Sequence, residues 1–273
     1  MSESLTCKNC GNSFTGKFCN LCGEKVYAEK DKSVKHIIGE GLHFITHFEG
    51  NFFNTLKAIF TRPGKLSLDY CNGVRKKYFK PLSFFLMLVI LYLLFPVFEG
   101  LNMKLEYHKV HKLYGSYASS EVERLINERN ITELQLADSF HHAGEKTSKF
   151  LLFIIIPFVA LFSWILGLRK KYFHHFVFTI EASSFFILWG FLLLPLLLFI
   201  IGFTTGFQFT SEGQTSVAIL VVFILYLSVA AKRFFSFKWW YSILYAILFA
   251  LALLVFLEYI YKFILFLIAI RLV

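Results

Sequence analysis

Residues 242–270 read SILYAILFALALLVFLEYIYKFILFLIAI, and the only charged side chains in this run are Glu258 and Lys262. A helix needs about 20 apolar residues to cross a hydrocarbon core of about 30 Å. The run is long enough to span a membrane and too long to cross it upright. We therefore expect a transmembrane helix that tilts, kinks or projects beyond the bilayer.

The rest of the chain repeats this pattern. Hydrophobic residues make up 56% of the sequence and charged residues only 17%, whereas soluble domains are about 45–50% apolar and about 25% charged. The composition and these runs predict an all-α membrane protein with about five transmembrane helices. The four further predicted spans are Leu82–Phe98, Phe150–Leu168, Ala182–Phe203, which Pro195 interrupts, and Ser216–Ala231.

Basic residues indicate the orientation of the chain. With five spans, three clusters fall on one face, which the positive-inside rule makes cytoplasmic. The polar loop 99–149 also carries Lys and Arg, and this observation opposes the assignment. The net charge of +10 is better explained by contact with anionic lipid than by a nucleic-acid partner, which we do not expect. The clusters are Arg75, Lys76, Lys77 and Lys80; Arg169, Lys170 and Lys171; and Lys232, Arg233 and Lys238.

Four of the five cysteines form two matched knuckles near the N-terminus. The knuckles are Cys7-x-x-Cys10, which is followed by Gly11, and Cys19-x-x-Cys22, which is followed by Gly23. Each Cys-x-x-Cys turn can place two thiolates on one tetrahedral metal, so we predict a four-cysteine zinc ribbon with a structural role. Iron is the alternative metal for these four cysteines. If they bind no metal, the alternative is a redox-active dithiol. Free thiolates also favour a reducing compartment and thus a cytoplasmic N-terminus.

The segment between the ribbon and the first span predicts an amphipathic helix at 33–60, lying in the membrane interface or against the bundle. Its polar face carries His36, His43 and His47, of which His43 and His47 have the spacing that can share a metal. A plain polar interfacial face explains the same histidines. The predicted division is a ribbon at 1–25, a linker with the interfacial helix at 26–81, and a bundle at 82–273, whose polar loop contains a second amphipathic helix at 120–140.

Charged residues inside apolar segments are costly and mark candidate pathways. Glu181, Glu258 and Lys262 are the candidates for a polar site in the membrane. The alternative is that Glu258 and Lys262 neutralise each other near a helix end and that Glu181 lies at headgroup level.

The knuckles and the segment before the first span resemble a known family. Phe18-Cys19-x-x-Cys22-Gly23-Glu24 and the pattern Arg62-Pro63-Gly64 … Asp69-Tyr70 … Gly73-Val74-Arg75 … Tyr78 … Pro81 are similar to an uncharacterised zinc-ribbon membrane family of Bacteroidota-type bacteria, domain of unknown function 3667. Val74 departs from the basic residue expected there. The resemblance implies a multi-pass protein of the bacterial inner membrane and no particular activity.

Three functional hypotheses remain. The first is a non-enzymatic scaffold or sensor whose cytosolic ribbon docks a protein partner. The second is a transporter or channel component in which Glu181, Glu258 and Lys262 face a cavity. The third is a membrane-embedded enzyme acting on lipid through His174, His175 or the histidine-rich helix, although no catalytic motif supports it. The ligand and the oligomeric state do not follow from the sequence.

Overall fold

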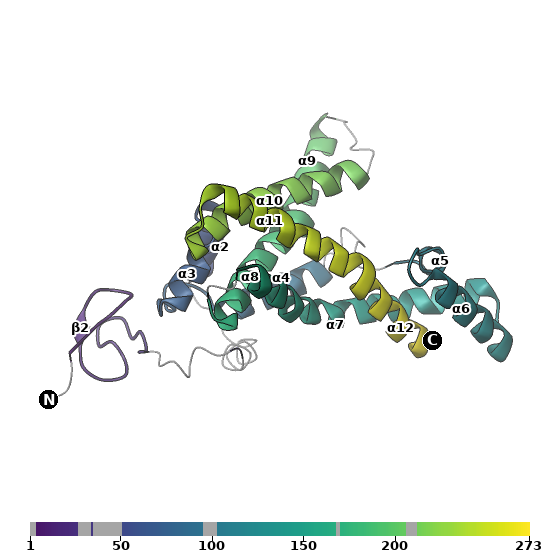
Figure 1. Ribbon diagram of the computed structural model, residues 1–273, viewed down its shortest axis with the longest axis horizontal. Coiled ribbons are helices and arrows are strands. Elements are labelled where there is room, and N and C mark those ends of the chain that lie inside the picture. The colour runs from purple at the N-terminus through teal and green to yellow at the C-terminus, as the bar shows by residue number, and fades with distance from the viewer. Residues whose placement is uncertain (1–3, 27–33, 35–50, 95–102, 168–169, 206–211) are drawn as a thin grey trace. The chain divides into compact units, whose positions relative to one another are not determined.

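The computed structural model describes residues 4–26, 34, 51–94, 103–167, 170–205 and 212–273 (Figure 1). The chain divides into two compact units. Unit 1 comprises Met1–Val97 and Val159–Ala250, and unit 2 comprises Phe98–Phe158 and Leu251–Val273. The predicted helix with His36, His43 and His47 falls mostly outside the described residues.

The N-terminal segment of unit 1 contains a minimal hairpin. Strands β1 (Leu5–Thr6) and β2 (Ser13–Phe14) pair antiparallel, with Leu5 opposite Phe14. An isolated bridge joins Phe18 and Lys25. The buried side chains that pack together here are Cys7, Phe14 and Cys19, so this segment has almost no hydrophobic core of its own.

The helices of unit 1 pack around α8 (Tyr172–Phe186), which is buried along nearly its whole length. Helices α2, α3, α4 and α10 all contact it (Figure 1). A helix covered on all sides needs no polar stripe, which explains the sequence YFHHFVFTIEASSFF. The neighbouring elements of unit 1 are α2 (Phe52–Thr61), α3 (Lys65–Cys71), α4 (Pro81–Leu94), η3 (Ile187–Leu193), α9 (Leu194–Thr205), α10 (Glu212–Phe235) and α11 (Trp239–Val255).

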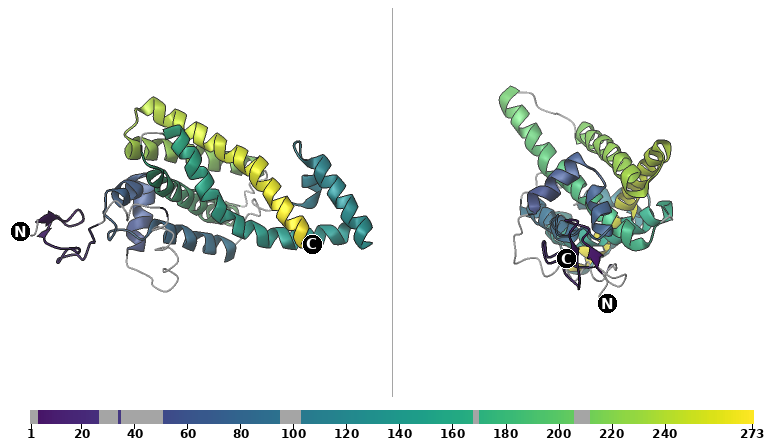
Figure 2. Two further views of the ribbon diagram at one scale, coloured as in Figure 1. Left: turned by 60° about the horizontal axis from the view of Figure 1, so that its bottom comes forward. Right: turned by 90° about the vertical axis from the view of Figure 1, so that its left-hand side faces the viewer.

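Unit 2 is a second, smaller core. It contains α5 (Leu105–Lys109) and α6 (Gly115–Arg129), which contact each other, together with η4 (Phe256–Tyr261) and α12 (Lys262–Leu272) (Figure 2). The long helix α7 (Glu133–Gly167) supplies residues to both units. The core of unit 2 is made of Leu105, Tyr114, Ala118, Val122, Leu125, Leu136, Phe140, Phe266, Ala269 and Ile270. The end of the run 242–270 is therefore covered by protein.

Three helices in the described part of the chain are long and apolar enough to cross a membrane: Tyr172–Thr205, Thr215–Phe235 and Trp239–Leu272. Only 28–33% of the most apolar window of each is buried, so their apolar outer faces require a lipid-like surrounding. Three of the five predicted spans thus correspond to helices that are long and apolar enough to cross a membrane. Two of the five predicted spans, Leu82–Phe98 and Phe150–Leu168, coincide with shorter apolar helices, Pro81–Tyr92 and Ile155–Gly167, and remain predictions.

Two local features differ from the expectations. The helix that contains the predicted span Ala182–Phe203 begins at Tyr172, because the polar residues in between are buried among helices and do not end the helix. The amphipathic helix predicted at 120–140 is broken. Asn130 adopts a left-handed conformation after α6, and Thr132 and Gln135 then form reciprocal hydrogen bonds that start α7. This capping box is a sequence signal for a new helix.

A π-helical turn precedes Pro195 in the first of the three spans. The segment η3 ends at Leu193, immediately before the turn that contains this proline. Proline has no N–H, and its ring clashes with the carbonyl four residues earlier. A locally widened helix accommodates both problems without breaking the span.

Candidate functional site

The two cysteine knuckles converge on one point. The four sulfur atoms all lie within 4.8 Å of one another, with 3.5 Å between the Sγ atoms of Cys7 and Cys22 and 3.7 Å between those of Cys10 and Cys19. A tetrahedral ion with bonds of about 2.3 Å to sulfur separates its ligands by about 3.8 Å. The geometry of the four thiols therefore fits a single metal ion.

Backbone hydrogen bonds build the two knuckles in the same way. Gly11 N donates to Cys7 O at 2.9 Å, and Gly23 N donates to Cys19 O at 2.8 Å. Both glycines have positive φ angles, 77° and 67°, which other residues adopt only with strain. The backbone N–H of Cys22 lowers the pKa of Cys19 to about 6, a shift that favours the thiolate needed by a metal.

Glu24, directly after the second knuckle, joins this segment to the region before α4. Its Oε2 accepts a hydrogen bond from Lys76 N at 2.8 Å, and the residue is 3% exposed. Its backbone oxygen accepts from Cys19 N at 2.8 Å. One residue thus contacts both a cysteine of the cluster and a segment more than fifty positions away. From the sequence, Glu24 was not a predicted site residue.

Glu181 is a buried carboxyl group of unit 1 that accepts four hydrogen bonds. It is 1% exposed, and its carboxylate accepts hydrogen bonds from Gly64 N and Ser67 N, each at 2.7 Å. Ser67 Oγ also donates to it, as does the hydroxyl of Tyr226 at 3.2 Å. Its partners are the unpaired N–H groups at the start of α3, which a carboxylate satisfies well.

The turn before α3 requires glycine. Gly64 has φ +78°, and a Cβ atom there would lie 2.5 Å from the backbone oxygen of Ala230 in α10. Beside it, Arg233 Nη1 donates to Pro63 O at 2.5 Å. The α2–α3 corner is therefore held against α10 by close backbone contact and against α8 by Glu181.

The segment after α3 folds back onto that helix. Asp69 pairs with Lys65 at 2.6 Å and accepts a hydrogen bond from the Tyr78 hydroxyl at 2.8 Å. Burial, followed by the contact with Asp69, raises the pKa of Tyr78, so this hydroxyl remains a donor. The guanidinium of Arg75 lies 4.4 Å from the centre of the Tyr70 ring. Side-chain contacts thus tie Tyr78 and Arg75, in the segment after α3, to Asp69 and Tyr70 of that helix.

A second buried polar cluster joins three helices. Ser163 Oγ lies 2.8 Å from His175 Nδ1 and 2.6 Å from the Tyr245 hydroxyl, and all three residues are buried. Gly167 leaves room for the imidazole, because a Cβ there would lie 2.6 Å from His175 Cε1. These contacts connect α7, α8 and α11 within unit 1. His175 was a candidate from the sequence, but nothing in the sequence pairs it with Ser163 or Tyr245.

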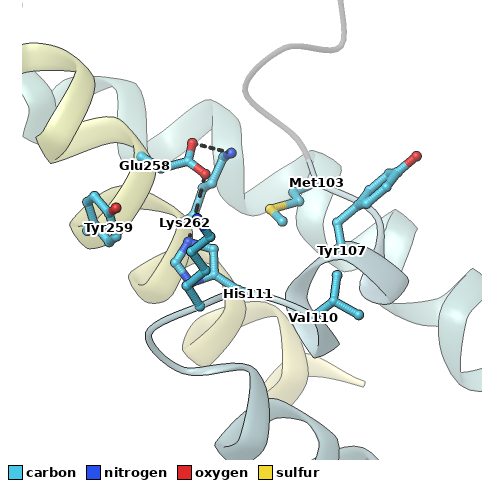
Figure 3. Close-up of a pocket in the computed structure, with 8 residues that line it drawn as sticks. Met103, Tyr107, Val110, His111, Glu258, Tyr259 and Lys262 are labelled. Carbon is cyan, nitrogen blue, oxygen red and sulfur yellow. Dashed lines mark hydrogen bonds and ion pairs between the residues drawn. The ribbon is translucent and has the colours of Figure 1, made fainter.

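Glu258 and Lys262 lie in unit 2, and their charged ends are 2.5 Å apart. His111 Nε2 lies 3.8 Å from the other oxygen of Glu258. All three side chains line a pocket of about 470 Å³ (Figure 3). Glu258 and Lys262 were candidates from the sequence, whereas His111 lies in the polar loop and has no sequence signal linking it to them.

Comparison with known proteins gives one match. Residues 49–93 match the model of the family described as Protein of unknown function (DUF3667). The matched segment contains α2, α3 and most of α4, and it includes Gly64 and Ser67, which donate to Glu181, and Asp69. It supports the family resemblance drawn from the sequence. No curated protein and no solved structure matches the chain.

Proposed function

We propose that this chain is a non-enzymatic membrane scaffold or sensor whose four-cysteine ribbon holds a structural zinc ion and docks a protein partner on the cytoplasmic side of a bacterial inner membrane. The observation that carries the proposal is the closed set of four thiols, linked through Glu24 to Lys76. Four thiolates leave no open position on zinc, so the ion would serve folding rather than catalysis. With so little core in the hairpin, metal binding would supply most of its folding free energy.

The surface of the ribbon supports the docking of a partner. Phe18 and Leu21, beside the second knuckle, are 58% and 72% exposed. They lie in a segment of otherwise polar character, and exposed aromatic and aliphatic side chains are common anchors in protein interfaces.

Contacts among the basic clusters support a shared cytoplasmic face. Lys170 Nζ donates to the backbone oxygen of Phe234 at 2.7 Å, which links the second cluster to the third. Arg233 reaches Pro63, in the turn that precedes the first cluster. The predicted placement of the three clusters on one side of the membrane agrees with this packing.

The bonding of Glu181 favours the scaffold over the transporter. A carboxylate that binds a travelling ion or substrate must exchange partners, whereas all four donors to Glu181 belong to the protein. The carboxylate holds the α2–α3 corner in place, and breaking those bonds would be costly. Transport through Glu181 would therefore require local unfolding of that corner.

Zinc content tests the metal site. The Cys19→Ser/Cys22→Ser double variant should lose the zinc that the purified wild-type chain retains at one ion per chain, measured by mass spectrometry of the metal. Cys71→Ser, which removes the buried cysteine outside the cluster, should keep it. Full zinc in the double variant contradicts the ribbon, and an iron chromophore in the wild type contradicts the metal assignment.

Partner capture tests the docking role. The full chain, purified in mild detergent, is compared with a Phe18→Ser/Leu21→Ser variant and with a chain lacking residues 1–30. We expect both altered chains to lose the same co-purifying protein while the double variant keeps its zinc. A set of partners unchanged by both alterations would reject the ribbon as the docking element.

A further inference from the structure

The pocket around Glu258 is lined by side chains of both charges. Glu258 and Lys262 face each other across one turn, and Lys112 also lines the pocket. Tyr107, Tyr259 and the thioether of Met103 supply aromatic and apolar surface (Figure 3). The volume of about 470 Å³ lies in the usual range for a small-molecule site.

The position of His111 is fixed by its neighbours. Its ring stacks on Tyr114 with centroids 4.1 Å apart and forms a T-shaped contact with the ring of Tyr259, with centroids 5.7 Å apart. Leu113 N donates to His111 Nδ1 at 3.3 Å. With Nδ1 acting as acceptor, the proton of the neutral ring is on Nε2. His111 therefore presents an N–H donor toward the oxygen of Glu258 that Lys262 does not contact.

The ion pair in the pocket is easily opened. The side chains of Glu258 and Lys262 are 49% and 26% exposed, and an exposed pair at i,i+4 contributes only a few tenths of a kcal/mol. A ligand carrying a single charge would pair with either Glu258 or Lys262 and would weaken the ion pair between them. A ligand carrying both charges would keep each residue paired and form two contacts in place of one.

We propose that this pocket binds a small zwitterion of the phosphoethanolamine type. The ammonium group contacts Glu258, and the aromatic side chains of Tyr107 and Tyr259 line the same pocket. The phosphate contacts Lys262 and Lys112 and accepts from His111. The same chemistry occurs in a free phosphoethanolamine and in the headgroup of phosphatidylethanolamine, so the two sources must be separated by experiment. The inference does not depend on the zinc ribbon or its partner.

Calorimetric titration of the purified full chain, in detergent free of phosphatidylethanolamine, tests the free ligand. Phosphoethanolamine should bind at least tenfold more tightly than ethanolamine or inorganic phosphate. Glu258→Gln and Lys262→Gln should each weaken its binding at least tenfold. Glu128→Gln is the matched control, because Glu128 is 54% exposed in an i,i+4 pair with Arg124 on α6 and does not line the pocket; it should bind as the wild type does.

Native mass spectrometry tests the lipid source. The chain is mixed with phosphatidylethanolamine or with phosphatidylglycerol of the same acyl chains, and lipid retention is compared with that of the Glu258→Gln and Lys262→Gln variants. Binding of either phosphoethanolamine or its lipid, lost in both variants, supports the site and identifies the source. The proposal is overturned if neither ligand binds, if both variants bind like the wild type, or if ethanolamine or phosphate alone binds as tightly. An unchanged elution volume and unchanged helix content by circular dichroism show that the variants remain folded.

Discussion

Acid should weaken unit 2 through one buried histidine. His108 is fully buried, and its Nδ1 lies 2.8 Å from the Tyr114 hydroxyl. Burial, followed by the positive charge of the nearby Lys262, lowers the pKa of His108 from 6.5 to about 4. Between about pH 6.5 and pH 4, His108 is therefore mostly neutral in the folded chain and mostly protonated in the unfolded chain.

The magnitude follows from proton linkage. Between pH 6.5 and pH 4 the unfolded chain binds more protons at this site, so the free energy of unfolding falls as the pH falls. With these two pKa values, the loss is about 2 kcal/mol from pH 7 to pH 5 and about 3 kcal/mol by pH 4. The first figure is a change on the order of 20-fold in the opening equilibrium.

Hydrogen exchange measures this opening directly. Protection factors, which already correct for the intrinsic effect of pH, are followed at the buried amides of Ala118 and Val122 in α6. We expect a decrease of about 20-fold from pH 7 to pH 5 in the wild type and a much smaller decrease in His108→Gln. Glutamine can still bond the Tyr114 hydroxyl but does not titrate.

A matched control separates His108 from the general effect of acid. His142→Gln changes a histidine whose side chain is 68% exposed, and it should keep the wild-type dependence on pH. Equal pH dependence in the wild type and in His108→Gln would refute the assignment of the effect to His108.

Three further substitutions test the packing. Glu181→Ala leaves the buried N–H groups of Gly64 and Ser67 without their acceptor and should cost about 3 kcal/mol or more; a fall in the thermal midpoint of the detergent-solubilised chain measures this, and an unchanged midpoint contradicts the capping role. Gly64→Ala should cost more than the ~1 kcal/mol of an ordinary left-handed glycine, because its Cβ meets the backbone of Ala230; the same assay shows whether the corner can relax. Thr132→Ala should cost about 1 kcal/mol and raise amide exchange in the first turn of α7 only; loss of protection throughout unit 2 would show that the cap does more than start that helix.

Local signals in the sequence predicted the local structure well. The apolar runs predicted membrane-spanning helices, and the spacing of Cys7, Cys10, Cys19 and Cys22 predicted their convergence, because a knuckle is formed by adjacent residues. The break between α6 and α7 was also encoded locally, in Asn130 and in the capping box that starts at Thr132, but the hydrophobic periodicity across 120–140 concealed it.

The roles of the charged residues required the tertiary structure. Glu181 looked like a candidate for a pathway because its partners, Gly64 and Ser67, lie more than a hundred positions earlier in the chain. Glu258 and Lys262 were paired correctly from their spacing, but the neighbouring His111 comes from a distant loop. The sequence alone determined the long apolar helices and the thiol cluster, since both follow from residues close together in the chain. Only the tertiary structure decided which charges are buried and what satisfies them, because that depends on which distant backbone groups the packed helices bring together.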